Sequence, residues 1–218
     1  MKTFLAKVDT FLGTSLGLRP RGLLLLATLC VLPTYLAPLW DMTMFAPQYP
    51  DGLRLHIWSY RLDGGNGGQD VKEINVLNHY IGMRDLETAD FSEFKWMPFV
   101  LGALGLLFLR AAVLGRMSEL VDVGVLYFYF GLFSLWSFAY KMWSYGHHLA
   151  PSAAVRVDPF MPPLFGGRKL ANFEVYSYPA LGSYGLFAVA ALLLLALALA
   201  WRDSSKTRVD AQAREATA

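Results

Sequence analysis

Residues 96–115 read WMPFVLGALGLLFLRAAVLG and contain one charged side chain, that of Arg110. A helix needs about 20 residues to cross the roughly 30 Å hydrocarbon core of a bilayer, and this stretch has that length. Its apolar residues form a continuous run, without the polar face of a helix on a soluble protein. The whole chain shares this bias, since 55% of its 218 residues are hydrophobic and 17% are charged. Soluble domains carry roughly 25% charged residues, so the sequence predicts an integral membrane protein.

Three other stretches have the length and apolar character of membrane spans: residues 21–40, 120–143 and 181–201. Because lipid offers no partner to backbone N–H and C=O groups, each span is expected to be a helix. The predicted fold is an all-α membrane protein with four transmembrane helices within residues 21–201. Residues 1–20 would form a cytoplasmic N-terminus. Residues 202–218 are polar and predict a disordered cytoplasmic tail. Pro33 and Pro38 are expected to kink the first span near its outer end.

The distribution of basic residues predicts the orientation of the spans. Taken together, the N-terminus, the link between the second and third spans, and the tail carry ten Lys and Arg residues against six Asp and Glu residues. Cytoplasmic flanks of membrane proteins carry such an excess of positive charge. Both termini are therefore predicted to be cytoplasmic, and residues 41–95 and 144–180 to form two extracytoplasmic loops. Trp40, Trp96 and Trp143 fall at the predicted outer interface, where aromatic side chains concentrate.

The first outer loop contains one predicted strand and one predicted helix. Between residues 53 and 57 the apolar side chains alternate with Arg54 and His56, a period of two that is typical of a strand. The run DGGNGG at 63–68 predicts a turn, and VKEINVLNHYIGM at 71–83 predicts a short helix that ends near Gly82. The second outer loop is rich in proline and glycine, so we expect an irregular cap.

All four histidines lie in the two outer loops, at positions 56, 79, 147 and 148. Imidazole and thioether are ligands of soft and borderline metal ions, so the loops are candidates for a copper site. His79 and Met83 are four residues apart and would share one face of the predicted helix. The candidate ligands are His79, Met83, His147, His148, Met42 and Met44. Adjacent helix positions differ by about 100°, so His147 and His148 would not both bind one ion on a regular helix.

Each of these candidates also has a purely structural interpretation. A loop histidine can satisfy backbone hydrogen bonds, and Met42 and Met44 can be ordinary hydrophobic residues at the membrane interface. His56 alternates with Arg54 on the predicted strand and is expected at the surface. The sequence leaves both interpretations open.

Composition and motifs exclude several classes of function. The net charge is only +2, so no positive field indicates nucleic-acid binding. Cys30 is the single cysteine, which excludes an internal disulfide and a CxxC redox or zinc motif. No Gly-x-Ser-x-Gly, Walker or HExxH sequence is present, and GGNGG lacks the context of a phosphate loop. We therefore expect a protein that is not an enzyme.

Several outer-loop motifs together resemble a known group of proteins. The motifs are MFAPQYPDGLRLHIW (44–58), INVLNHYIGM (74–83), YGHHLAP (145–151), PPLFG (162–166) and NFEVYSYP (172–179). Over residues 20–200 the chain is similar to small four-helix bacterial membrane proteins encoded with clade II nitrous oxide reductase and its copper-maturation factors. The resemblance implies a multi-pass accessory protein of the bacterial cytoplasmic membrane. Such a protein would support the assembly, copper loading or electron supply of a respiratory copper enzyme.

The resemblance also implies a periplasmic or membrane protein partner. The positions expected to contact it are Pro47, Tyr49, Pro50, Asn78 and Tyr80. Two other functions remain open. The first is a structural membrane anchor or assembly subunit that docks a periplasmic partner without metal. The second is an electron-transfer subunit that binds quinol near the outer ends of the helices.

Overall fold

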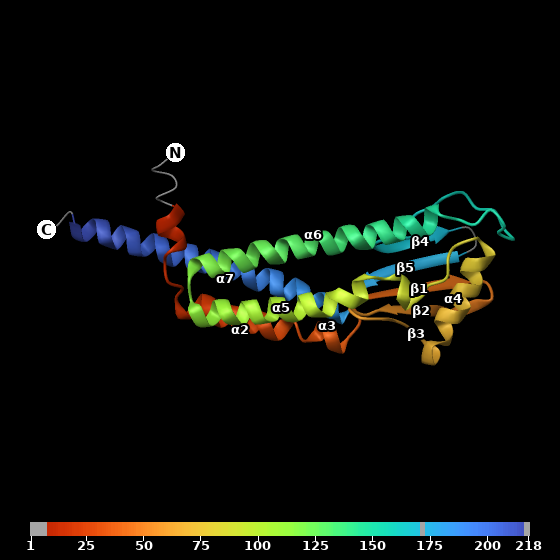
Figure 1. Ribbon diagram of the computed structural model, residues 1–218, viewed down its shortest axis with the longest axis horizontal. Coiled ribbons are helices and arrows are strands. Elements are labelled where there is room, and N and C mark those ends of the chain that lie inside the picture. Colours follow the sequence, from red (N-terminus) through yellow and green to blue (C-terminus); the bar gives the residue numbers. More distant parts are fainter. Residues whose placement is uncertain (1–7, 171–172, 216–218) are drawn as a thin grey trace. The chain divides into compact units, whose positions relative to one another are not determined.

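The computed structural model describes residues 8–170 and 173–215 and divides the chain into two compact units (Figure 1). The helical unit comprises Met1–Leu32, Leu101–Phe130 and Leu186–Ala218. The sheet unit comprises Pro33–Val100 and Gly131–Gly185.

The helical unit is built from α2 (Leu18–Cys30) and from parts of α5 (Glu93–Leu114), α6 (Met117–His147) and α7 (Leu181–Glu215). Its interior is filled by small and apolar side chains that are fully buried: Leu24, Ala27, Phe108, Ala111, Val189 and Ala196. Large apolar side chains also point outward, such as Leu106 and Leu194, each 69% exposed. Helices that are apolar on all sides are typical of a membrane environment.

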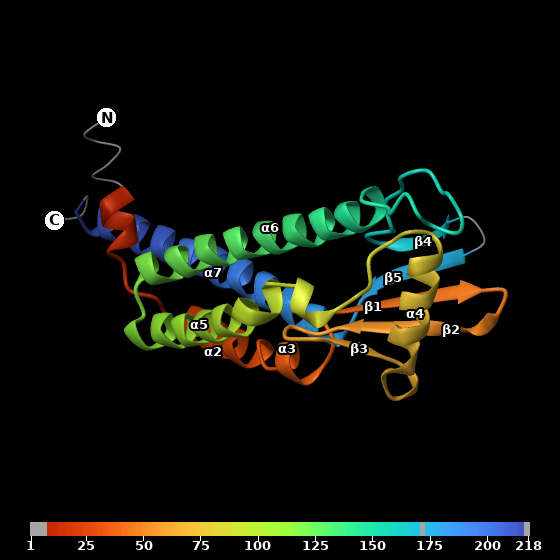
Figure 2. The ribbon, with the colours of Figure 1, turned by 45° about the vertical axis from the view of Figure 1, so that its right-hand side comes forward.

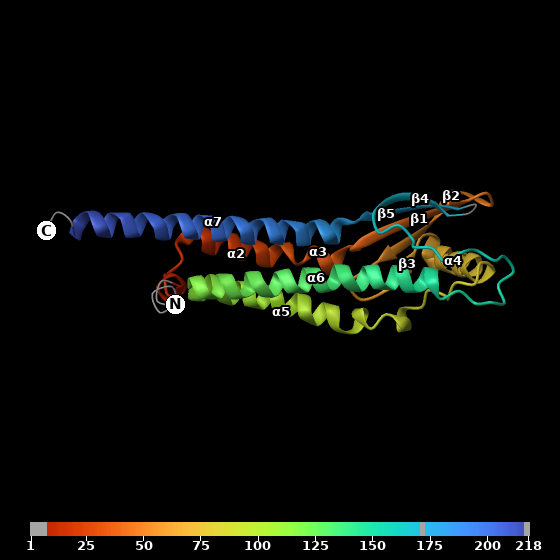
Figure 3. The same cartoon turned by 90° about the horizontal axis from the view of Figure 1, so that it is seen from above.

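Arg21 closes the C-terminal end of α5 within the helical unit. Its Nε atom donates to the carbonyl of Ala112 at 2.6 Å, and one terminal nitrogen donates to Val113 at 2.7 Å. The last carbonyls of a helix have no partner inside the helix, so a cationic donor there stabilises the end. The backbone N–H of Leu16 donates to Gly115, which follows α5 in a left-handed conformation. These contacts place the segment before α2 beside the link between α5 and α6 (Figure 3).

The prediction of four spans is wrong for the first span. Within residues 8–170 and 173–215, three helices are long and apolar enough to cross a membrane: Glu93–Leu114, Met117–His147 and Leu181–Ser204. The first apolar stretch forms two helices instead, α2 and the short α3 (Pro33–Leu36). Proline lacks a backbone N–H and its ring clashes with the carbonyl four residues earlier, so Pro33 ends one helix and begins another. At the other end, α7 continues to Glu215, where the sequence predicts a disordered tail from residue 202.

The sheet unit shows that the all-α prediction is also wrong. Five strands form one antiparallel sheet in the order β3-β2-β1-β5-β4 (Figure 2). Strands β1 (Trp40–Ala46), β2 (Tyr49–Ile57) and β3 (Leu62–Gly64) come from the first outer loop. Strands β4 (Gly166–Leu170) and β5 (Phe173–Pro179) come from the second. Because β1 pairs with β5, the two loops fold into a single body, and the expected irregular cap contains an ordered hairpin.

Alternating side chains explain the inner and outer faces of this sheet. Leu53 and Leu55 of β2 are buried, as the period-two pattern predicts, while Arg54 lies exposed between them. In β5, Val175 and Ser177 are buried and alternate with the exposed Glu174, Tyr176 and Tyr178. The inner face packs against Ile74 and Leu77 of α4 (Gln69–Tyr80), the helix that the sequence predicts in this loop.

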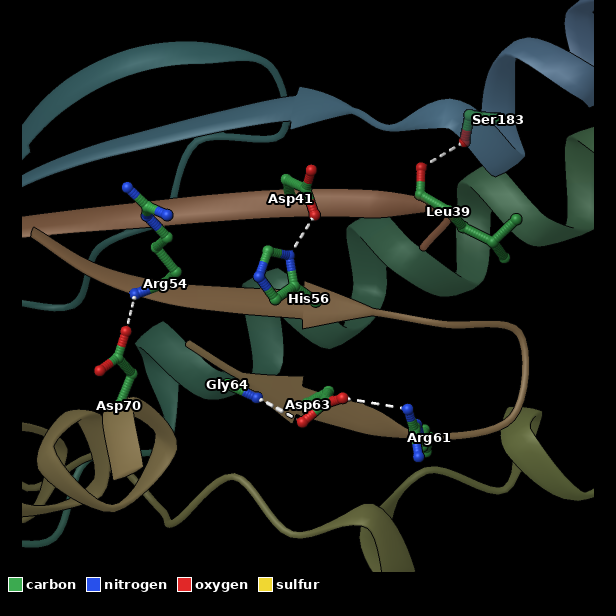
Figure 4. Close-up of polar contacts among 9 residues, drawn as sticks. All are labelled: Leu39, Asp41, Arg54, His56, Arg61, Asp63, Gly64, Asp70 and Ser183. Atoms are coloured by element: carbon green, nitrogen blue, oxygen red, sulfur yellow. Dashed lines mark hydrogen bonds and ion pairs between the residues drawn. The ribbon is translucent and has the colours of Figure 1, made fainter. Parts of the chain in front are cut away.

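A buried carboxylate fixes the beginning of α4 against β2. Asp70 is 2% exposed and accepts a hydrogen bond from the backbone N–H of Arg54 at 2.9 Å (Figure 4). It also accepts one from the side-chain amide of Asn66 at 2.7 Å. A β-carbon on Gly65 would lie 2.3 Å from this carboxylate, so the close approach requires glycine. Further along the helix, the hydroxyl of Tyr49 donates to the carboxylate of Glu73 at 2.5 Å. Contacts at two points therefore set the position of α4 on the sheet.

Candidate functional site

The site lies in the sheet unit, where the end of α4 meets the end of α6. At the end of α4, the backbone N–H of Met83 donates to the carbonyl of Asn78 at 2.8 Å, and that of Gly82 donates to His79 at 3.2 Å. Gly82 has φ +80°, so this pattern is a glycine-terminated helix end. The helix therefore stops at Tyr80, and the prediction that His79 and Met83 share one face of a continuous helix is wrong.

Backbone hydrogen bonds join this helix end to the chain that follows α6. The N–H of Ala150 donates to the carbonyl of Gly82 at 2.7 Å, and the N–H of Val155 donates to Tyr80 at 3.1 Å. The N–H of Phe160 returns to the carbonyl of Gly146 at 3.0 Å. A β-carbon on Gly146 would lie only 1.8 Å from the carbonyl oxygen of Phe160. Gly146 thus lies within α6 and permits a close backbone contact.

This junction forms an open depression of about 730 Å³, here called the imidazole depression. Its lining includes His79 and Met83 from the first outer loop and His147 and His148 from the second. Four of the six candidate metal ligands are therefore brought to one place, although they come from segments far apart in the sequence.

The orientation of the two adjacent imidazoles is set by the end of α6. Nδ1 of His147 lies 2.9 Å from the carbonyl of Trp143, and Nδ1 of His148 lies 3.0 Å from that of Ser144. A carbonyl can only accept, so each Nδ1 carries a proton, and in the neutral ring Nε2 is then the nitrogen with the free lone pair. The ring of His147 also stacks on that of Trp143, with 4.7 Å between their centroids. Both imidazoles are consequently in the tautomer that can bind a metal ion through Nε2.

The charges around the imidazole depression favour a cation. Asp85, Glu87 and Asp90 contribute carboxylates to its lining. The C-terminal ends of α4 and α6 add the partial negative charge of their helix dipoles. Arg84 is the opposing charge, and other groups hold its guanidinium. It donates to the hydroxyl of Ser144 at 3.3 Å and lies 4.9 Å from the centre of the Tyr145 ring.

The side chains that line the imidazole depression do not form a closed set of metal ligands in the structure. In the part of the chain that the structure describes, no three His, Cys, Asp or Glu side chains are grouped closely enough to hold a metal ion. A closed zinc-type site of four such ligands is therefore not formed there. A site for Cu(I) would combine imidazole Nε2 atoms with the thioether of Met83, a soft ligand outside that group.

Met42 and Met44 lie elsewhere, in a second cavity here called the methionine cavity. This cavity has a volume of about 390 Å³ and is lined by β1, β2, α4, β5, the end of α6 and the chain around Val157. Met42 and Met44 alternate along β1 and so face the same side of the sheet. Met142 of α6 also lines this cavity, and the sequence pattern did not indicate it. Met83 lines both this cavity and the imidazole depression. No local pattern identifies Met142, because only the packing of α6 over the sheet brings it there.

His56 is separate from both cavities, as its alternation with Arg54 predicts. Its Nδ1 lies 2.6 Å from a carboxylate oxygen of Asp41, its cross-strand neighbour on β1 (Figure 4). Neither cavity has His56 in its lining. A substitution of His56 is therefore a suitable control for substitutions of the other three histidines.

The residues expected to contact a partner divide into exposed and buried positions. Pro47 is exposed in the turn between β1 and β2, Pro50 is exposed at the start of β2, and Tyr80 is 56% exposed at the end of α4. Tyr49 is partly buried and bonded to Glu73. Asn78 is only 2% exposed, so the prediction that it contacts a partner is wrong. Its backbone carbonyl instead terminates α4 and fixes Met83.

Comparison with known proteins finds no family model, no curated protein and no solved structure that matches the chain. The candidate function therefore rests on the geometry of the sheet unit and on the sequence motifs that form it.

Proposed function

We propose that this chain is a non-enzymatic accessory protein of the bacterial cytoplasmic membrane that holds Cu(I) on its extracytoplasmic side. The copper would be supplied to a respiratory copper enzyme such as nitrous oxide reductase, the association that the loop motifs imply. The observation that carries the proposal is the convergence of His79, Met83, His147 and His148 on the imidazole depression.

The chemistry of these four side chains supports a soft monovalent ion. Imidazole nitrogen and thioether sulfur bind Cu(I), whereas Mg²⁺ and Ca²⁺ require oxygen ligands. The nearby carboxylates of Asp85, Glu87 and Asp90 would attract a cation without having to bind it directly. An open depression of this kind suits an ion that must be passed on, because a partner can reach it.

The orientation proposed for the membrane places the sheet unit outside the cell. The three apolar helices make a multi-pass membrane protein, and the positive charge of the link between α5 and α6 favours a cytoplasmic position for that link. Hydrogen bonds of Leu16 and Arg21 keep the N-terminal segment beside the end of α5, which supports a cytoplasmic N-terminus. Two short helices, in place of a single span, then connect this segment to β1.

Single-cysteine labelling tests this orientation directly. In a Cys30→Ala background, Ser152→Cys reports on the exposed chain after α6 and Ser118→Cys on the start of α6. A membrane-impermeant maleimide applied to intact cells lacking the outer membrane should label the first variant only. Labelling of Ser118→Cys alone would invert the proposed topology.

Cu(I) titration against a colorimetric chelator tests the metal site in protein purified in lipid nanodiscs. The double variant His79→Ala/His147→Ala should lose at least about tenfold in affinity, a loss of about 1.4 kcal/mol or more. His56→Ala is the matched control, because His56 bonds to Asp41 and does not line the depression. Equal Cu(I) affinity in the double variant and the control would contradict the proposal.

The thioether is tested separately from the imidazoles. Met83→Leu keeps the approximate volume and apolar character of the side chain but removes the sulfur. We expect weaker Cu(I) binding with little change in folding, and no loss of affinity for the control Met161→Leu. X-ray absorption of the bound copper should show both sulfur and nitrogen scattering in the wild type and nitrogen alone in Met83→Leu.

Docking of a partner without metal is the second candidate, supported by exposed side chains of the sheet unit. Val76 and Tyr80 on α4 are 63% and 56% exposed, and Phe165 before β4 is 69% exposed. Exposed apolar side chains at the edge of an ordered body are typical of a contact surface. Cross-linking from native membranes distinguishes the two functions. Capture of one partner by a protein that contains no copper, unaffected by His79→Ala/His147→Ala, would favour docking alone.

A further inference from the structure

The methionine cavity has the size of a small-molecule pocket. Its volume of about 390 Å³ falls within the range of about 300–1,000 Å³ that is usual for such pockets. It is partly open to solvent and lies within the sheet unit.

The lining of the cavity disfavours water as its occupant. Its floor is the buried apolar cluster of Leu53, Leu55, Ile74 and Leu77. Ordered water needs two to four polar partners, and apolar cavities remain dry or take up apolar molecules. The polar side chains that line it are few, among them Asn78 and the exposed Arg156 and Asp158. A mostly apolar pocket with a few polar groups is typical of a small-molecule site.

Four of the eight methionines of the chain line this one cavity: Met42, Met44, Met83 and Met142. Thioethers also bind Cu(I), but the lining of this cavity is mostly apolar and, among the described residues, includes no histidine that could complete a mixed imidazole and thioether site. Methionine side chains are flexible and polarizable and adapt to apolar ligands of variable shape. A flexible apolar chain therefore matches both the size and the lining.

We propose that the methionine cavity binds a flexible aliphatic chain of the kind that fatty acids and membrane lipids carry. The membrane-type helices of the chain supply the setting, because a bilayer is a reservoir of such chains. The chain could belong to a free fatty acid or to a membrane lipid, and the same apolar lining would accept either. This site does not depend on metal binding in the imidazole depression.

Photo-crosslinking in nanodiscs tests the site with two defined probes. One is a fatty acid with a diazirine on its alkyl chain, and the other is phosphatidylcholine with the same group on one acyl chain. We expect mass spectrometry to find crosslinks on β1 and α4, which lie outside the three candidate spans, besides those on lipid-facing helices. Labelling by the fatty acid only, or by the phospholipid only, identifies the source of the chain. Crosslinks confined to the spans with both probes would overturn the proposal.

A matched pair of valine variants separates a specific cavity from general lipid contact. Val157 lines the cavity, whereas Val155, two residues earlier, is 41% exposed and does not. Val157→Trp should abolish the crosslinks on β1 and leave those on the spans, while Val155→Trp should leave both. Equal labelling of β1 in the two variants would also overturn the proposal. Unchanged thermal stability of Val157→Trp would exclude misfolding as the cause. Val157→Asp places a charge at the same wall of the cavity and should also abolish the crosslinks on β1.

Discussion

The backbone N–H of Ala150 donates to the carbonyl of Gly82 across 2.7 Å, joining two segments that the sequence separates by two helices and a loop. This contact is possible because Gly82 adopts φ +80° and leaves no β-carbon in the way of Ala150. Its consequence is that the end of α4, with His79 and Met83, faces the end of α6, with His147. The candidate metal site therefore depends on backbone geometry as much as on its ligands.

Replacing Gly146 should disrupt this junction from the side of α6. A β-carbon there would meet the carbonyl oxygen of Phe160 at 1.8 Å, so Gly146→Ala must displace the backbone. Overpacking of this kind costs about 1–3 kcal/mol of folding free energy. Thermal unfolding and Cu(I) affinity should both fall. Gly131→Ala is the control in the same helix, since nothing lies within 4 Å of its added β-carbon. A variant of Gly146 as stable as the control would contradict the assigned close contact.

Removing the carboxylate of Asp70 should release α4 from β2. Asp70→Ala leaves the partly buried backbone N–H of Arg54 without its acceptor, at a cost of about 1 kcal/mol. The exposed Asp51 on β2 provides the control variant Asp51→Ala, which we expect to leave stability unchanged. Chemical denaturation of the two proteins measures the difference. Hydrogen exchange of the α4 amides should be faster in Asp70→Ala but not in Asp51→Ala, which would show that the loss of stability comes from the release of α4.

The contact between Tyr49 and Glu73 should stabilise the sheet unit only within a window of pH. The hydrogen bond from Tyr49 lowers the pKa of Glu73 below its ordinary value of 4.5, so the stabilisation it provides is lost as pH falls through the lowered pKa. The same hydrogen bond raises the pKa of Tyr49 above its ordinary value of 10.0. The stabilisation from this bond is therefore also lost as the pH rises through the raised pKa of Tyr49. Tyr49→Phe should therefore destabilise the protein near neutral pH and have little effect at either extreme. Tyr80→Phe, at an exposed position, should show no such window. A difference between wild type and Tyr49→Phe that is constant across pH would exclude this role.

Arg21 should matter far more than its neighbour Arg19 for the stability of the helical unit. Arg21→Ala removes two hydrogen bonds to the last carbonyls of α5, each worth about 1.5–3 kcal/mol at most because the donor is charged. Arg19 is exposed, and Arg19→Ala removes the same single positive charge as Arg21→Ala. Arg19→Ala is therefore the control. Midpoints of thermal unfolding in detergent should separate the two variants. Equal midpoints would show that this cap contributes nothing measurable.

Local sequence patterns predicted much of the secondary structure of the chain. Long apolar runs predicted the helices that became α5, α6 and α7, and alternation at Leu53 and Leu55 predicted β2 with its correct inner face. They failed at Pro33, where one proline divides an apolar stretch of sufficient length into α2 and α3. They also failed at β5, whose alternation of Val175 and Ser177 with exposed residues was overlooked amid the surrounding prolines and glycines.

By itself the sequence determined the three long apolar helices that are candidate membrane spans, and it placed His79 and His147 in the two long segments between apolar stretches, because hydrophobic length is a local property of a chain. Only the tertiary structure decided that the two loops share one sheet, through the pairing of β1 with β5. It also placed Met42 and Met44 in a cavity apart from the histidines. Strand pairing and helix packing join residues distant in sequence, and their register depends on contacts such as those of Gly82 and Gly146, which no local pattern specifies.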